Sequence, residues 1–179
     1  MTLIRKQWPA FVLAFVLPLL AVYWWWGGFN RVAVAETESG PHFYAYLEHE
    51  GDLGKLPETQ ARVFALLKQA GITPGDTITV LLTDPRKSAR GGQRAKTGYR
   101  VALDAKLPAE LQSEIIPRRR VYAATVQAAV ALAPSKAYQA LADYLQPMGR
   151  DITLPAVEIY RPSGSAAKVG VLTVEIAAP

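Results

Sequence analysis

The apolar positions of this chain form one long uninterrupted run near the start, followed by many short ones. No charged residue occurs in residues 7–30, and the 19 residues of Trp8–Trp26 are almost wholly apolar. A helix of that length, rising about 1.5 Å per residue, spans roughly the hydrocarbon core of a bilayer. Trp8 at one end and the aromatic group Tyr23–Trp26 at the other suit the two membrane interfaces. The pattern predicts that residues 1–30 form a cytoplasmic stub and a single transmembrane anchor.

A cleaved signal peptide is the alternative interpretation of this run, with Ala33-Val34-Ala35 as its cleavage box. The run is longer than a signal peptide needs and ends in three tryptophans, so we favour an uncleaved anchor. Arg5 and Lys6 precede the run, and Arg31 follows it. Because this small excess of positive charge keeps the N-terminus in the cytoplasm, residues 31–179 are predicted to lie in the periplasm, tethered to the inner membrane.

Beyond residue 31 the apolar positions follow two different periods. Two segments repeat every three to four residues and predict helices, one with Pro57 in its first turn and one that opens at Pro134. Gln60 is the one polar residue on the inward stripe of the first helix, and Tyr138 lies on the stripe of the second. The other segments have β-strand character. The predicted strands are Val32–Ala35, His42–His49, Thr77–Leu82, Arg94–Leu103, Arg118–Val130, Leu154–Arg161 and Lys168–Ala177, and Lys106–Pro117 is predicted as a connecting segment.

The order strand–helix–strand–strand occurs twice along the chain. Pro57 and Pro134 are 77 residues apart, and so are Pro85 and Pro162. We therefore expect an α+β fold of two pseudo-twofold strand–helix–strand–strand modules, with either two antiparallel sheets or one continuous sheet. Both helices would pack on one side of the strands, which leaves the opposite, concave face available.

The strand Leu154–Pro162 carries the candidate chemistry. Successive side chains of a strand point to opposite faces, so Glu158 and Tyr160 share one face. If that face is covered, the carboxylate must find a partner, take up a proton or bind a ligand, because an unpaired buried charge is costly. Arg120 is a candidate partner. The alternative is a half-exposed strand on which Glu158 meets water or Arg161.

Charge, cysteine content and histidine spacing exclude several classes of site. The chain has 20 basic and 15 acidic residues, but three of the basic ones lie at or before residue 31, so the remaining chain is nearly balanced and does not predict nucleic-acid binding. Without cysteine there are no disulfides or thiolate metal sites. His42 and His49 lie at the two ends of one predicted strand, about 23 Å apart when extended. No metal site, cofactor, Ser-His-Asp arrangement or P-loop is predicted.

Several motifs in this order resemble the GyrI-like effector-binding domains, which include the ligand domains of multidrug-responsive transcription activators and stand-alone gyrase-inhibitor-like proteins. The resemblance covers roughly Arg31 to the C-terminus, and its most specific parts are the Glu-Ile-Tyr strand and the Asp-Pro turn. The matching residues are Tyr46-Leu-Glu-His49-x-Gly51, Ile78-Thr-Val-Leu-Leu-Thr-Asp84-Pro85, Arg94 to Gly98-Tyr99, Arg120–Val126 and Pro155-Ala-Val-Glu158-Ile-Tyr160.

The resemblance implies a ligand groove between two modules, in which Glu158 meets lipophilic, cationic small molecules. Tyr160 would lie beside it, and Tyr46, Tyr99 and Tyr122 are candidate walls of the groove. Each of these three tyrosines is equally suited to an ordinary position in the core or at its rim.

Two other functions stay open. Some members of the family hydrolyse strained electrophilic molecules with the same glutamate, which would make Glu158 a general base. The third hypothesis is a membrane-anchored adaptor that binds a protein segment. The helix-turn-helix domain of the transcription activators is lacking, so direct gene regulation is not predicted. The favoured function is a tethered domain that senses or sequesters lipophilic or cationic compounds, and its protein partner is unknown.

Overall fold

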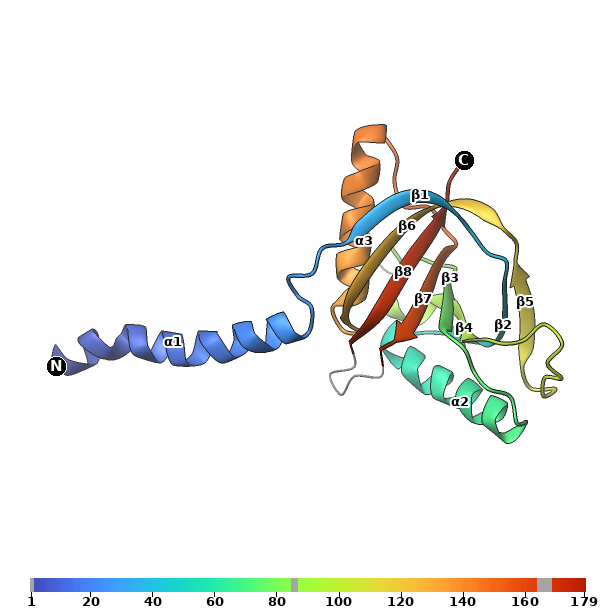
Figure 1. Cartoon of the computed structure of the whole chain (residues 1–179), viewed down its shortest axis with the longest axis horizontal. Coiled ribbons are helices and arrows are strands. Elements are labelled where there is room, and N and C mark those ends of the chain that lie inside the picture. Colours follow the sequence, from blue (N-terminus) through green and yellow to red (C-terminus); the bar gives the residue numbers. More distant parts are fainter. Residues whose placement is uncertain (1, 85–86, 164–168) are drawn as a thin grey trace.

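The computed structural model describes residues 2–84, 87–163 and 169–179, apart from the side chains of residues 2–11 and 90. A long N-terminal helix leads into an α+β body built on one eight-stranded antiparallel sheet (Figure 1). The elements are α1 (Thr2–Trp25), β1 (Ala33–Ser39), β2 (His42–Glu50), α2 (Leu56–Gln69), β3 (Thr77–Leu81), β4 (Arg94–Arg100), β5 (Gln112–Ile116), β6 (Arg119–Ala129), α3 (Ala133–Leu145), β7 (Ala156–Pro162) and β8 (Val169–Ala177), with short 3-10 turns at Leu53–Lys55, Arg90–Gly92 and Gln146–Met148.

Helix α1 projects away from the sheet (Figure 1). Within the part of the chain that the structure describes, no helix has the length and hydropathy needed to cross a membrane. The single transmembrane helix predicted from the sequence is not supported by this result. The segment after α1 is held to the body by hydrogen bonds: Ala129 N donates to Trp26 O at 2.8 Å, and Asn30 Nδ2 donates to Gln127 O at 2.7 Å.

The strand order is β1-β6-β8-β7-β3-β4-β2-β5, so the sheet has two similar halves. One module is β2-α2-β3-β4 and the other is β6-α3-β7-β8, and they meet where β3 pairs with β7. Val80 and Val157, which are 77 residues apart, lie directly opposite each other in this pairing. The pseudo-twofold axis therefore passes between them, which confirms the predicted repeat and shows one continuous sheet.

The outer strands of the two halves are joined at a corner that the sequence did not predict. Ser39 pairs with Arg119 and His42 pairs with Ile116, so the β1–β6 ladder continues in the same register as the β2–β5 ladder. Figure 1 shows these strands arching over from one side of the body to the other. Gly40 sits at the bend with φ 92°, and a Cβ there would lie 2.9 Å from Pro117 O.

Strand β5 lies inside the segment 106–117, for which the prediction of a connecting segment is wrong. Only Ile116 of its five residues is buried, so the segment has no apolar alternation that would mark a strand. Its pairing with β2, a partner some 70 residues away in the chain, fixes its extended conformation. The strand predicted at Arg94–Leu103 was also three residues too long, because β4 ends at Arg100.

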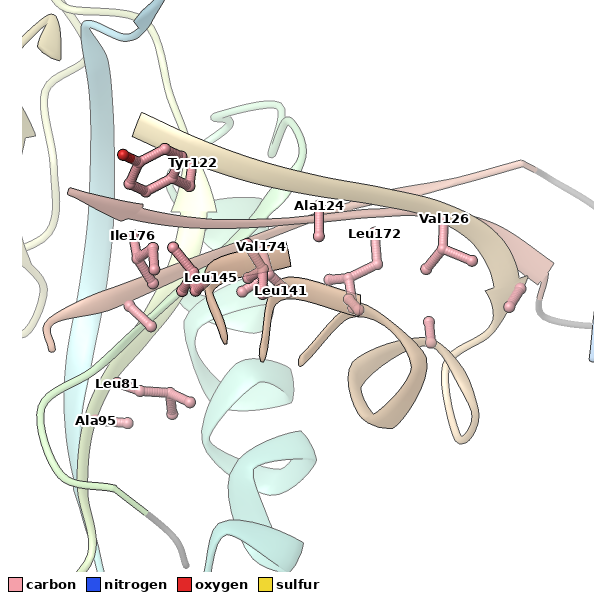
Figure 2. Close-up of a cluster of buried hydrophobic side chains, with 14 residues drawn as sticks. Leu81, Ala95, Tyr122, Ala124, Val126, Leu141, Leu145, Leu172, Val174 and Ile176 are labelled. Carbon is pink, nitrogen blue, oxygen red and sulfur yellow. The ribbon is translucent and has the colours of Figure 1, made fainter. Parts of the chain in front are cut away.

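Both helices pack on one face of the sheet, as predicted. Leu141 and Leu145 of α3 lie against side chains of β6 and β8 such as Ala124 and Val174 (Figure 2). Val63 and Leu67 of α2 pack instead with Ala45 of β2, in a separate cluster. Each fully buried leucine of this kind contributes about 1.5–3 kcal/mol to stability.

The opposite face of the sheet is not left open, which corrects the expectation of an available concave surface. Side chains from β2, β3, β5 and β7 form a third buried cluster there. Because the sheet curls at its corner, these side chains face one another across the concave side and bury themselves. The members of this cluster are Tyr44, Tyr46, Ile78, Val80, Ile116 and Val157.

Candidate functional site

Glu158 lies near the centre of the sheet, on the face that carries both helices. In the sheet it stands between Thr79 of β3 and Val174 of β8. A cavity of about 220 Å³ opens beside it, between α2 and the first turn of α3. Strand β7 ends at Pro162 and pairs on both sides, so the backbone that carries Glu158 is held firmly. The cavity is lined by Gln60, Thr77, Thr79, Val130, Ala133, Pro134, Glu158, Tyr160 and Leu172.

The partner of Glu158 is a phenol from α3. The Tyr138 hydroxyl donates a hydrogen bond to Glu158 Oε1 at 2.9 Å. Burial raises the pKa of Glu158 above its ordinary value, and the Tyr138 hydrogen bond lowers it by a smaller amount. The carboxyl group is therefore harder to ionise than one in water, because desolvation penalises its charged form.

Both arginines considered as partners of Glu158 pair elsewhere. Arg161 Nη2 lies 3.0 Å from Asp76 Oδ2, and Arg120 forms an ion pair with Glu36 of β1 on the exposed edge of the sheet. No lysine or arginine is among the described residues that line the cavity. Within the described part of the chain, no basic side chain is therefore placed in the cavity to neutralise an ionised Glu158.

A layer of hydroxyl and amide groups forms the polar side of the cavity. Thr79 and Thr97 are both buried, with their hydroxyl oxygens 2.9 Å apart. Gln60 Nε2 of α2 donates to Thr97 Oγ1 at 3.1 Å. Buried hydroxyl groups need such partners, so the polar exception on the apolar stripe of α2 has a structural reason. In the sequence, Gln60 on the apolar stripe was the signal that α2 covers polar groups of the sheet.

Tyr160 lines the cavity and shares the face of Glu158, as alternation along the strand predicts. Burial raises the pKa of its hydroxyl. Its ring lies over Gly170 of β8, where a Cβ would come within 2.5 Å of Tyr160 Oη and of Arg161 O. The missing side chain at Gly170 therefore gives the Tyr160 ring its place beside the cavity.

Tyr99 stands next to the cavity without lining it. Thr77 pairs with Tyr160 on one side and with Tyr99 on the other, so the three side chains form one row across β7, β3 and β4. The Tyr99 hydroxyl is hydrogen-bonded to the Thr77 side chain, and its ring packs edge-on against Phe64 of α2 at 5.8 Å. Tyr99 thus contacts Thr77, which lines the cavity, but does not line the cavity itself.

Tyr46 and Tyr122 are not near Glu158, which corrects their predicted place as walls of one groove. Tyr46 lies on the opposite face of the sheet, where its ring stacks on Tyr44 with 5.2 Å between centroids. Tyr122 is on the helix face but close to the C-terminal end of α3, where it contacts Tyr144 and Arg150. Strand pairing and position along α3 decide both placements.

A polar cluster at the corner of the sheet was also missed by sequence reasoning. Ser39 Oγ donates to Glu175 Oε1 at 2.5 Å and lies 3.0 Å from His42 Nε2. In a catalytic triad the acid contacts the other ring nitrogen of the histidine, so this contact pattern is not that of a triad. His49 bonds Thr59 and the backbone of Asp52, and among the described residues no three His, Cys, Asp or Glu side chains converge as a metal site requires.

No family model matches this chain, and no curated protein matches it in sequence. Among solved structures it is similar to the crystal structure of the EcmrR C-terminal domain, with a TM-score of 0.65 and 12% identity over 82% of this chain and 96% of that one. It is also similar to EcmrR in a cryo-EM structure of the EcmrR–DNA complex in EcmrR-RPo, with the same score and identity over 97% of this chain and 68% of that one. At this identity the likeness shows the fold alone: the chain has an antiparallel α+β fold similar to the EcmrR C-terminal domain and consistent with a GyrI-like fold.

Proposed function

We propose that this protein is a small-molecule-binding effector domain whose cavity beside Glu158 takes a compact organic cation with an aromatic or aliphatic body. The observation that carries the proposal is a carboxyl group with a raised pKa at a cavity whose described lining has no basic residue. A cation in this cavity would supply the positive charge that the described lining residues do not. Similarity in fold to the EcmrR C-terminal domain is consistent with ligand binding but names no ligand.

The lining also favours an apolar body on the ligand. Val130, Pro134 and Leu172 offer apolar surface, and the Tyr160 ring offers a π face. A cation over such a ring gains about 0.5–2 kcal/mol, and an ion pair about 4 Å apart gains roughly 4 kcal/mol at an effective dielectric constant of 20. A volume of about 220 Å³ suits one ring with a small ammonium group.

Thermal shift with benzyltrimethylammonium tests the proposal, with N,N-dimethylbenzamide as a neutral compound of similar size. The full chain, purified in a non-ionic detergent, is expected to be stabilised by the cation and much less by the amide. At a hundred times its Kd a ligand stabilises by about 2.7 kcal/mol.

The matched variants are Glu158→Gln in the cavity and Glu110→Gln on an exposed loop. Glu158→Gln should raise the Kd for the cation by about thirtyfold. This corresponds to half of the ion-pair energy given above, because the site is partly open to solvent. Glu110→Gln should bind like the wild type. Equal thermal shifts for Glu158→Gln and the wild type would contradict the proposal that the Glu158 carboxylate binds the cation.

We further propose that residues 8–26 tether this domain, residues 31–179, to the inner membrane with the domain in the periplasm. The support is the uncharged sequence of this segment and the exposure of its described side chains, including Phe15, Leu19 and Trp25. Extraction of cell membranes with alkaline carbonate should leave the full chain in the pellet, and a periplasm-active reporter fused after Pro179 should be active. Release into the carbonate supernatant would contradict the tether.

A further inference from the structure

A second cavity lies at the other end of α3, away from Glu158. Its volume is about 380 Å³. Tyr122 of β6, Leu145 of α3 and Ile176 of β8 form its inner surface, and all three are at most 5% exposed. Arg150 and Thr153, from the segment that follows α3, stand at its edge. The cavity is thus apolar inside with polar groups at one side.

Arg150 is held in a fixed orientation over this cavity. Its guanidinium group donates to the Tyr122 hydroxyl oxygen and lies 5.8 Å from the centroid of the Tyr122 ring. Its backbone N–H donates to Leu145 O at 3.3 Å, which ties the segment to the end of α3. Because the Tyr122 oxygen accepts from Arg150, the phenolic proton remains available to another acceptor.

The guanidinium group of Arg150 forms no ion pair with a carboxylate among the residues that the structure describes. The neighbouring Asp151 also lines the cavity, but its carboxylate lies 3.7 Å from Lys87 Nζ and accepts a hydrogen bond from Ile152 N. The C-terminal end of α3 carries only about half an elementary negative charge, less than the full charge of the guanidinium. The C-terminal residue Pro179 lines the cavity as well, so Arg150 is the one basic residue in the described lining and forms no ion pair with a described carboxylate there.

We propose that this second cavity binds an organic carboxylate with an apolar body, such as an arylalkyl or medium-chain acid. The guanidinium group presents parallel N–H donors that match a carboxylate, and the Tyr122 hydroxyl adds a third donor. Leu145 and Ile176 receive the apolar body. The two cavities lie at the two ends of α3: the carboxyl group of Glu158 is at one, and the guanidinium group of Arg150 is at the other.

Isothermal titration calorimetry with 4-phenylbutanoate and 4-phenylbutanamide tests this assignment on the full chain in non-ionic detergent. The two probes differ in one group, which is an anionic carboxylate in the first and a neutral amide in the second. The wild type is expected to bind the carboxylate at least about tenfold more tightly, as loss of a charge-assisted hydrogen bond implies. Arg150→Gln should remove this preference, and Tyr122→Phe should reduce it while keeping the ring.

Arg62→Gln is the matched control, because Arg62 is exposed on α2, which packs on the other half of the sheet. It should retain the full preference, and so should Glu158→Gln, which separates this site from the cation cavity. Because Arg150 is exposed, the Arg150→Gln variant is expected to fold normally. An unchanged circular dichroism spectrum checks this. Absence of carboxylate binding to wild type at 1 mM probe, or an equal preference in Arg150→Gln, would overturn the assignment.

Discussion

Replacing Glu158 with glutamine is expected to stabilise the ligand-free protein at neutral pH. The amide oxygen can still accept the Tyr138 hydrogen bond, whereas the charge that burial disfavours is gone. A desolvated polar group left partly uncompensated costs about 1–3 kcal/mol. For a chain of this length 1 kcal/mol corresponds to about 2–4 °C in Tm, so the variant should melt about 2–12 °C higher than the wild type at pH 8.

The pH dependence gives this prediction its sign. The pKa of Glu158 is raised in the folded protein, so the folded state holds its proton more tightly than the unfolded chain. The wild type is therefore relatively most stable below the ordinary glutamate pKa and loses that stability as pH rises through the raised folded pKa. Glu158→Gln lacks this loss, so the difference in stability between variant and wild type should grow from pH 4 to pH 8.

Urea denaturation of the full chain at several pH values measures this difference, with Glu110→Gln as the exposed control. The control should follow the wild-type profile at every pH. If Glu158→Gln is no more stable than the wild type at pH 8, Glu158 is a well-satisfied structural carboxylate and the case for a cation in its cavity fails.

Three further substitutions test how the site is built. Tyr138→Phe should raise the pKa of Glu158 further and lower stability at neutral pH by about 1–2 kcal/mol, measured by urea denaturation with the titration followed by NMR. Gly170→Ala should destabilise by about 1–3 kcal/mol and shift the Tyr160 ring, seen as changed tyrosine fluorescence or ring NMR signals; unchanged signals would contradict the packing argument. Leu141→Ala should cost about 2–5 kcal/mol in the core, and a loss below 1 kcal/mol would show that α3 packs less tightly than described.

The sequence by itself determined the two modules and the fact that Glu158 and Tyr160 share one face of their strand. Both depend on local periodicity: alternation along one strand places Glu158 and Tyr160 together, and the spacing of 77 residues between prolines marks the two modules. Both helices were predicted because their apolar stripes are local as well. The polar residue Gln60 on one stripe indicated, without identifying it, the polar layer beside the cavity.

Tertiary structure alone decided which residues meet Glu158. Tyr138 reaches it from another element, whereas Tyr46 falls on the far face and Tyr122 joins the Arg150 cavity. β5 likewise became a strand only through its pairing with β2. Periodicity tells which side chains share a face, but register, sheet curvature and helix position are set by contacts between residues far apart in the chain, and no local pattern encodes them.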